Sequence, residues 1–201
     1  MVKIWINRSR KLRNLIVIYG CHGAGKTTLA KNILLSDGLD FSEYQNKYGK
    51  YTLSQNKKYV AVGKYTINCG GADSLKCTQD YYNMLYELIF NYPKSSIIIE
   101  GIFLSGLFNK PLNEFLKIKY QYNINVLQVF LLADTKTSYN RVANRSGRLP
   151  NIKNIKGKVN SVKNNIIKFR QLNEFPNVII NTIGKTKEEV YGEFRQFYEK
   201  L

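Results

Sequence analysis

The sequence predicts a three-layer α/β fold in which a mainly parallel sheet carries helices on both faces. Short apolar runs at residues 15–19 and 96–100 alternate with longer amphipathic segments such as 78–91. A glycine-rich segment joins the first of these runs to a helix, which is typical of sheets that bind phosphates at their carboxyl edge. With 201 residues and neither a repeat nor a linker, the chain is expected to form one domain spanning residues 1–201.

The individual elements follow from apolar periodicity and from the residues that bound helices. The apolar side chains of segment 78–91 recur on one helical face, and Pro93 ends that helix. Thr186 and Glu189 have the spacing of a capping box, which predicts a helix from residue 187. Strands are expected at 2–6, 15–19, 59–63, 96–100, 125–133 and 177–181, and helices at 26–35, 78–91, 111–122, 135–145, 159–172 and 187–201. Residues 37–58 show no clear period and are expected to form a loop with at most one edge strand.

Composition excludes several classes of protein. The longest apolar runs, 15–20 and 96–103, fall short of the roughly 20 residues that a membrane span needs. The first residues are basic but lack the apolar core of a signal peptide, so a cytoplasmic protein is expected. The single histidine, His22, argues against a zinc site and a histidine-based catalytic triad. The three cysteines form no CxxC pair and suit a reducing compartment.

The net charge of +17 is concentrated in two segments. Residues 1–36 contain seven basic residues and no acidic one, and residues 135–173 contain ten basic residues and no acidic one. The rest of the chain is close to neutral. Because a coding bias toward lysine would spread the excess evenly, this concentration indicates a polyanionic partner.

Residues 20–27 read Gly-Cys-His-Gly-Ala-Gly-Lys-Thr and match the phosphate-binding pattern GxxxxGK[ST]. The pattern lies between a buried strand and a helix, so backbone N–H groups can surround an anion at the helix N-terminus. Lys26 is expected to reach the β- and γ-phosphates of ATP, and the Thr27 hydroxyl to hold Mg²⁺. The predicted nucleotide-binding residues are Gly20, Gly23, Ala24, Gly25, Lys26, Thr27 and Thr28. A second GKT at 184–186 lacks the upstream glycine and is interpreted as a helix start.

A carboxylate ends the apolar strand at 96–100. In a parallel sheet, ligands bind at the carboxyl ends of the strands, so Glu100 is expected to face the phosphates and to hold Mg²⁺. Asp134, at the end of the next long strand, is the alternative metal ligand. A purely structural role for Glu100, in which it caps the following turn, remains open.

Arg141, Arg145 and Arg148 are spaced by four and three residues, which places them on one face of a helix that runs into a loop. Arginine side chains in a closing lid stabilise the charge of a transferring phosphoryl group. The sequence LLADTKTSYNRVANRSGR resembles the strand, helix and arginine lid of small P-loop kinases, and it predicts a lid at about 146–158. The alternative is a solvated basic face.

A further segment reads Gly63-Lys64-Tyr65-Thr66, followed by Cys69-Gly70-Gly71-Ala72-Asp73. Paired glycines permit close backbone approach, and an aspartate after them is placed to accept a proton from an acceptor hydroxyl, although a turn with a capping aspartate explains the pattern equally well. This GKY…GGAD stretch resembles one in phage-encoded P-loop kinases, including the 5-hydroxymethyluracil DNA kinases of thymine-hypermodifying phages. The resemblance implies an ATP- and Mg²⁺-dependent kinase with Asp73 as the acceptor-side base. It implies a substrate site formed by Lys64, Tyr65, Gly70, Gly71 and Asp73.

The expected acceptor is therefore the hydroxymethyl group of 5-hydroxymethyluracil in double-stranded DNA, and the basic segment 135–173 is expected to contact DNA phosphates. Such a base must be flipped out of the duplex, and Tyr65, Tyr81 and Tyr82 lie near the GGAD segment in sequence and could stack on it. The chain has 15 tyrosines, however, and a core role is the first expectation for any one of them. The alternatives are a deoxynucleotide or nucleoside kinase, a 5′-hydroxyl polynucleotide kinase, and a non-catalytic ATP-binding module that docks on nucleic acid.

Overall fold

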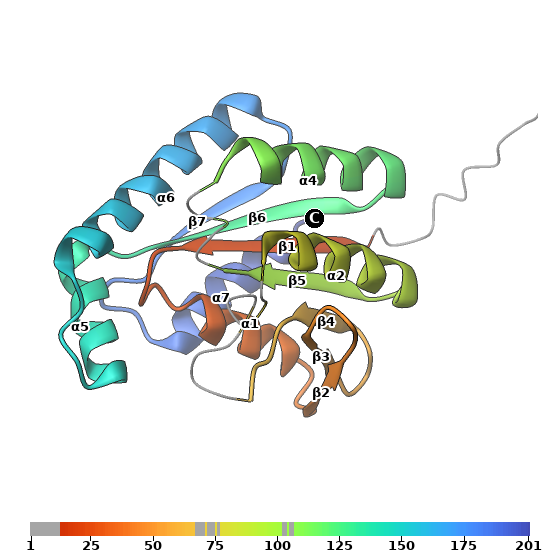
Figure 1. Ribbon diagram of the computed structural model, residues 1–201, viewed down its shortest axis with the longest axis horizontal. Coiled ribbons are helices and arrows are strands. Elements are labelled where there is room, and N and C mark those ends of the chain that lie inside the picture. Colours follow the sequence, from red (N-terminus) through yellow and green to blue (C-terminus); the bar gives the residue numbers. More distant parts are fainter. Residues whose placement is uncertain (1–12, 67–70, 72–74, 76, 102–103, 105–106) are drawn as a thin grey trace, which may run out of the picture.

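The computed structural model describes residues 13–66, 71, 75, 77–101, 104 and 107–201 (Figure 1). The strands are β1 (Asn14–Gly20), β2 (Phe41–Gln45), β3 (Lys50–Ser54), β4 (Tyr59–Val62), β5 (Ser96–Glu100), β6 (Asn125–Leu132) and β7 (Asn177–Asn181). The helices are α1 (Lys26–Leu34), α2 (Thr78–Asn91), α4 (Asn109–Tyr122), α5 (Thr135–Ser146), α6 (Ile152–Leu172) and α7 (Lys187–Tyr198). In this part of the chain, no helix has the length and apolar character that crossing a membrane requires.

All seven strands form one sheet in the order β2-β3-β4-β5-β1-β6-β7. The five strands β4, β5, β1, β6 and β7 are parallel, and β2 and β3 extend the sheet as antiparallel edge strands. Strand β1 lies between β5 and β6, so its end at Gly20 lies beside the carboxyl ends of both. Ligands of parallel sheets bind at this edge.

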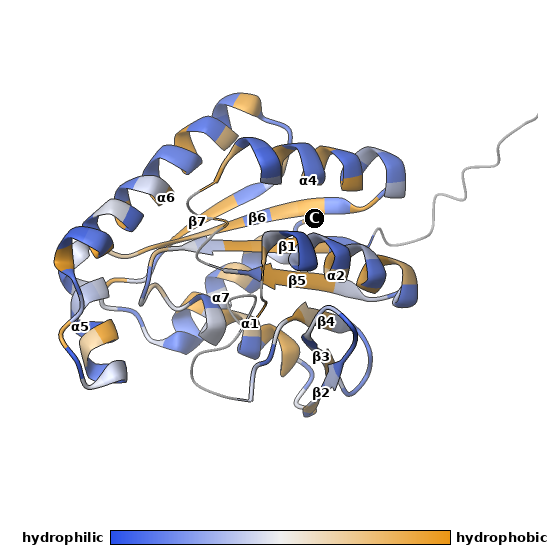
Figure 2. Cartoon of the chain, in the orientation of Figure 1, coloured by the Kyte–Doolittle hydropathy of each residue, from blue (hydrophilic) through white to orange (hydrophobic). Residues whose placement is uncertain are grey.

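Helices cover both faces of the sheet, as the sequence predicts (Figure 1). On one face, α2, α4 and α6 pack over an aromatic core in which Tyr19 stacks on Phe130 and both contact Phe169. On the other face, α1 and α7 bury a mainly aliphatic core that includes Ile33 and Val190. Figure 2 shows the matching pattern, with apolar strands inside and helices whose hydrophilic residues face outward.

The predicted strands and helices are confirmed in the part of the chain that the structure describes, with two differences. The first is the segment 37–58, which contains two strands and not a loop with one edge strand. Strand β2 is largely exposed, and its side chains therefore lack the apolar alternation that identifies a strand in a sequence. A stacked cross-strand pair, Tyr44 opposite Tyr51, links β2 to β3 with ring centroids 5.5 Å apart. The strand predicted at 2–6 lies outside the described residues.

The second difference concerns the predicted lid. Helix α6 begins at Ile152, seven residues earlier than expected, so the loop predicted at 146–158 is reduced to residues 147–151. Asn151 caps the helix by accepting hydrogen bonds from the backbone N–H groups of Lys153 and Asn154. Ile155 and Val159 extend the buried stripe of α6 by one more turn. Most of the segment that the sequence predicts as a lid loop, residues 152–158, is therefore helical.

Candidate active site

The loop between β1 and α1 has the geometry of a phosphate-binding loop. Gly25 occupies the position before α1 with a left-handed backbone (φ 95°) that favours glycine, and no side chain caps the helix there. The first N–H groups of α1 are thus left to bind a ligand. No acidic residue lies in the first turn, so the positive end of the helix dipole is not neutralised by its own side chains.

Lys26 lies over this loop. Its side chain is buried, and its ammonium donates hydrogen bonds of 3.1 Å to the backbone carbonyls of Gly20 and of Cys21. The carbonyls hold the charge at the carboxyl end of β1, in the position from which a lysine reaches a phosphate in the loop. This placement agrees with the role predicted for Lys26.

Thr27 and Glu100 are brought together by the pairing of β1 with β5, in which Ile18 lies opposite Glu100. The Thr27 hydroxyl donates a 3.0 Å hydrogen bond to Glu100 Oε1, and Glu100 is 1% exposed. Hydroxyl and carboxylate oxygens are the ligands that Mg²⁺ prefers, so this pair fits the predicted metal site.

Asp134, the alternative metal ligand, has a different role. It is exposed at the N-terminus of α5, where its carboxylate accepts a 2.6 Å hydrogen bond from the Thr137 N–H. That hydrogen bond, together with one from the Thr137 hydroxyl, lowers the pKa of Asp134. The carboxylate is thus engaged as a helix cap, and Glu100 is the strand-end acid that contacts the loop.

The three arginines predicted to act together are separated. Arg141 donates hydrogen bonds to the Gly23 carbonyl (3.2 Å) and to the hydroxyl and carbonyl of Thr182 (3.0 and 2.7 Å). It therefore ties the phosphate-binding loop to the end of β7. Arg145, one turn later on α5, and Arg148, in the connection to α6, are both exposed.

A pocket of about 270 Å³ opens between the phosphate-binding loop, α5 and the connection from β7 to α7. Besides the predicted loop residues and two of the arginines, it is lined by Leu29, Thr182, Lys185, Thr186, Lys187 and Val190. The capping box predicted at Thr186 is confirmed by reciprocal hydrogen bonds with Glu189. The second GKT is thus a helix start, and because β7 pairs with β6 in parallel, that start lies at the ligand-binding edge. Strand order, which the local sequence does not reveal, is the signal that would have identified these residues.

Of the predicted substrate residues, Lys64, Tyr65 and Gly71 lie in the described part of the chain, and Gly70 and Asp73 lie outside it. The Gly71 N–H donates a 2.9 Å hydrogen bond to the Lys64 carbonyl, and Gly71 has a left-handed backbone (φ 77°). A Cβ at Gly71 would overlap the Glu100 carboxylate, so the glycine allows the backbone to lie directly against the Glu100 side chain.

Tyr65 does not have the stacking role considered for it. Its ring is fully buried, and its hydroxyl donates a 3.4 Å hydrogen bond to the Val62 carbonyl. Tyr81 and Tyr82 are likewise at most 2% exposed, so these two tyrosines have the expected core role. Burial, followed by the proximity of Tyr82, raises the pKa of Tyr81 well above its ordinary value.

Glu43 on β2 holds the segment after Gly63. Its Oε1 accepts hydrogen bonds from the N–H groups of Tyr65 and Thr66 (2.9 Å each) and from the Thr66 hydroxyl (2.7 Å). Burial alone would raise the pKa of Glu43, but these hydrogen bonds and Lys50 outweigh it, so the pKa lies below its ordinary value. The antiparallel edge that the sequence did not reveal thus anchors the loop beside Glu100.

Comparison with known proteins confirms the resemblance to a phage DNA kinase. The chain is 31% identical over 163 residues to the 5-hmdU DNA kinase of Bacillus phage SP10. The match covers 78% of this chain but 25% of that protein, so the chain spans about a quarter of the length of its relative. No protein-family model matches the chain.

A solved structure confirms the kinase-like fold. A gluconokinase from Sinorhizobium meliloti superposes with a TM-score of 0.54 at 12% identity, covering 95% of this chain and 94% of that one. At this identity the likeness concerns the fold alone, which is the three-layer α/β fold of P-loop kinases. A deoxyadenosine kinase from M. mycoides with bound dATP superposes with a TM-score of 0.46 at 14% identity, covering 92% of this chain and 98% of that one, a likeness too low to add to this assignment.

Proposed function

We propose that this chain is an ATP- and Mg²⁺-dependent phosphotransferase whose acceptor is the hydroxymethyl group of 5-hydroxymethyluracil in DNA. The observation that carries the phosphotransferase assignment is the hydrogen bond between Thr27 of the phosphate-binding loop and the buried Glu100. This contact supports the proposal because it brings two oxygen groups that would suit Mg²⁺ beside a loop that would bind nucleotide phosphates, at the carboxyl edge of the sheet.

On the donor side, the N–H groups of the loop and the Lys26 ammonium would bind the phosphates of ATP. Thr27 and Glu100 would hold Mg²⁺, which supplies charge neutralisation between the phosphates. Arg145 lines the pocket and would meet negative charge on the transferring group, while Arg141 positions the loop through Gly23. Arg148 is not among the residues that line the pocket.

The proposed acceptor is supported by sequence similarity to a known kinase and by the positive charge of segment 135–173. The relative from phage SP10 is named a 5-hmdU DNA kinase. The ten basic residues of segment 135–173 exceed what one nucleotide and one small acceptor require. Asp73 is proposed as the base that accepts the hydroxyl proton, on the GGAD pattern alone. The γ-phosphoryl group would form a bond to the hydroxymethyl oxygen as its bond to ADP breaks.

The test uses ATP labelled in the γ-phosphate and end-blocked duplexes that contain either thymine or 5-hydroxymethyluracil. Digestion to nucleosides locates the label. Label on the hydroxymethylated base alone supports the proposal. Label on free nucleotides, with none on either duplex, contradicts it and indicates a nucleotide kinase. ATP binding together with steeply salt-dependent DNA binding, but with no transfer, indicates a non-catalytic module.

A further inference from the structure

A groove of about 420 Å³ lies between the start of α4 and the middle of α6. The two helices pack side by side on the same face of the sheet, as the contact between Phe108 and Phe169 shows (Figure 1). The start of α4 follows β5, the strand that ends in Glu100, so the α4 side of the groove is close along the chain to the proposed metal site. Phe108, Asn109 and Lys110 line one side of it, and Ser161, Asn164 and Lys168 line the other.

The groove is cationic. None of the eight described residues that line it is acidic, and Lys110 and Lys168 face it from opposite sides. Both lysines lie over aromatic rings: the Lys110 ammonium is 5.4 Å from the centroid of Tyr82, and the Lys168 ammonium is 5.1 Å from that of Phe108. A ring face orients an ammonium without neutralising its charge. Both charges therefore remain available to an anion.

The start of α4 adds to this positive potential. Its first turn contains no acidic residue, and its cap residue, Phe108, has no side-chain oxygen to accept from the first N–H groups. The positive end of the helix dipole thus opens on the groove. Asn109, Ser161 and Asn164 supply uncharged hydrogen-bonding groups, as sites that bind phosphodiesters commonly do.

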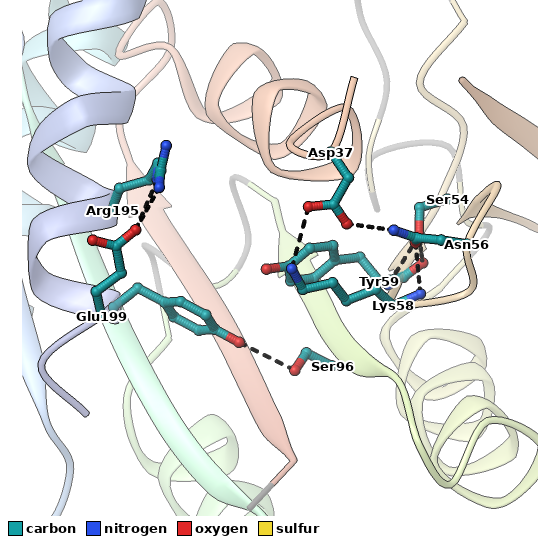
Figure 3. Close-up of polar contacts among 9 residues, drawn as sticks. Asp37, Ser54, Asn56, Lys58, Tyr59, Ser96, Arg195 and Glu199 are labelled. Carbon is teal, nitrogen blue, oxygen red and sulfur yellow. Dashed lines mark hydrogen bonds and ion pairs between the residues drawn. The ribbon is translucent and has the colours of Figure 1, made fainter. Parts of the chain in front are cut away.

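A second hollow, of about 370 Å³, lies at the opposite edge of the sheet and is lined by both cations and carboxylates. There, Lys58 pairs with Asp37 at 3.3 Å and Arg195 pairs with Glu199, so two of its four cations are neutralised within the protein (Figure 3). The groove between α4 and α6 differs because no carboxylate is among the described residues that line it.

We propose that this groove binds the sugar-phosphate backbone of the DNA acceptor, with Lys110 and Lys168 contacting phosphates that flank the target nucleotide. The inference rests on the proposed function and deepens it, because it specifies how a polymer would be preferred to a free nucleotide. A free nucleotide lacks flanking phosphodiesters, so it would gain nothing from the groove. Binding there would raise affinity for the polymer and leave the chemical step unchanged.

The test compares the Lys110→Gln/Lys168→Gln double variant with a charge-matched control, Lys94→Gln/Lys200→Gln. The control lysines are exposed and lie at the opposite edge of the sheet. Fluorescence anisotropy with a labelled 30-mer, measured as a function of salt, gives the slope of log K against log[salt] for each variant. Two lost phosphate contacts should reduce the magnitude of that slope by about 1.4 for a single strand and about 1.8 for a duplex. Lys110→Arg/Lys168→Arg should restore the slope.

A wild-type slope in the groove variant, or an equal loss in the control variant, would overturn the proposal. Because this readout is binding, it does not depend on transfer. If wild-type protein labels free nucleotides and not DNA, the proposed function fails, whatever the slopes show. If wild-type protein does phosphorylate DNA, the groove variant should raise the KM for DNA with little change in kcat, and an unchanged KM counts against the groove.

Discussion

The hydroxyl of Thr27 and the carboxylate of Glu100 are hydrogen-bonded at 3.0 Å, although 73 residues separate them along the chain. The contact forms because β1 and β5 are neighbours in a parallel sheet and end at the same edge. A phosphate-binding loop and a buried acid are thereby combined into one site, and the behaviour of the site can be predicted from this arrangement.

Glu100→Gln should lower kcat by at least about a hundredfold, which corresponds to about 2.7 kcal/mol of transition-state stabilisation. The amide has the same shape but carries no charge to hold Mg²⁺ beside Thr27. Steady-state transfer assays over a range of Mg²⁺ concentrations measure the effect. Asp134→Asn is the matched control, because asparagine caps a helix as well as aspartate does and transfer should be unaffected. Equal losses in both variants would assign the metal elsewhere.

Lys26→Ala should abolish transfer, because the ammonium held over the loop by two carbonyls is the charge expected to reach the β- and γ-phosphates. Single-turnover assays with labelled ATP measure the loss, and circular dichroism verifies folding. Transfer within tenfold of wild type would show that Lys26 has no part in phosphate binding.

Arg141→Gln should destabilise the protein and weaken ATP binding together. Arg141 donates three hydrogen bonds that connect Gly23 with Thr182, and hydrogen bonds from a charged donor contribute about 1.5–3 kcal/mol each at most. A net loss equivalent to one such bond lowers Tm by roughly 3–12 °C in a domain of this length. Thermal unfolding with and without ATP gives both quantities. Arg148→Gln, an exposed position, should leave Tm within about 1–2 °C of wild type.

Asp73→Asn should abolish transfer and leave ATP binding intact, because an acceptor-side base is not needed to hold the donor. Isothermal titration with a non-hydrolysable ATP analogue, alongside the transfer assay, separates the two. Retained transfer would remove Asp73 from this role, and lost ATP binding would indicate that it supports the donor site instead.

Glu43 should make stability depend on pH. Its pKa in the folded protein lies below the ordinary value of 4.5, so the stabilisation is present above about pH 4.5 and is lost as the pH falls through the lowered pKa. Urea unfolding from pH 3 to pH 7 should show a difference between wild type and Glu43→Gln that shrinks toward acid. A difference independent of pH would mean that hydrogen-bonding shape, and not charge, holds Tyr65 and Thr66.

The donor half of the site was predictable because its signals are local. The GxxxxGKT pattern and the acid that ends a buried strand are both contained in short segments, and the structure places Lys26, Thr27 and Glu100 together. What the sequence did not reveal depends on tertiary packing. The burial of Tyr65 and the contact between Arg141 and Thr182 both join segments whose adjacency follows from the fold.

The secondary structure was also predictable where its signals are local and not where it depends on packing. The core strands and most helices were predicted because their burial produces a clear period. Only one edge strand was allowed for in segment 37–58, where the structure has two, because β2 is largely exposed, and pairing with the neighbouring strand defines it more than apolar content does. The start of α6 was missed because basic residues and Gly157 obscure its apolar stripe.

The contact between Gly71 and Glu100 has a mechanical consequence. Gly71 lies against the carboxylate on one side and against Gly63 on the other, with no room for a side chain at either glycine. Gly63, Gly71 and the Glu100 carboxylate therefore lie in consecutive close contact. A side chain added at either glycine would displace its neighbour in this row, and at Gly71 that neighbour is the proposed Mg²⁺ ligand itself.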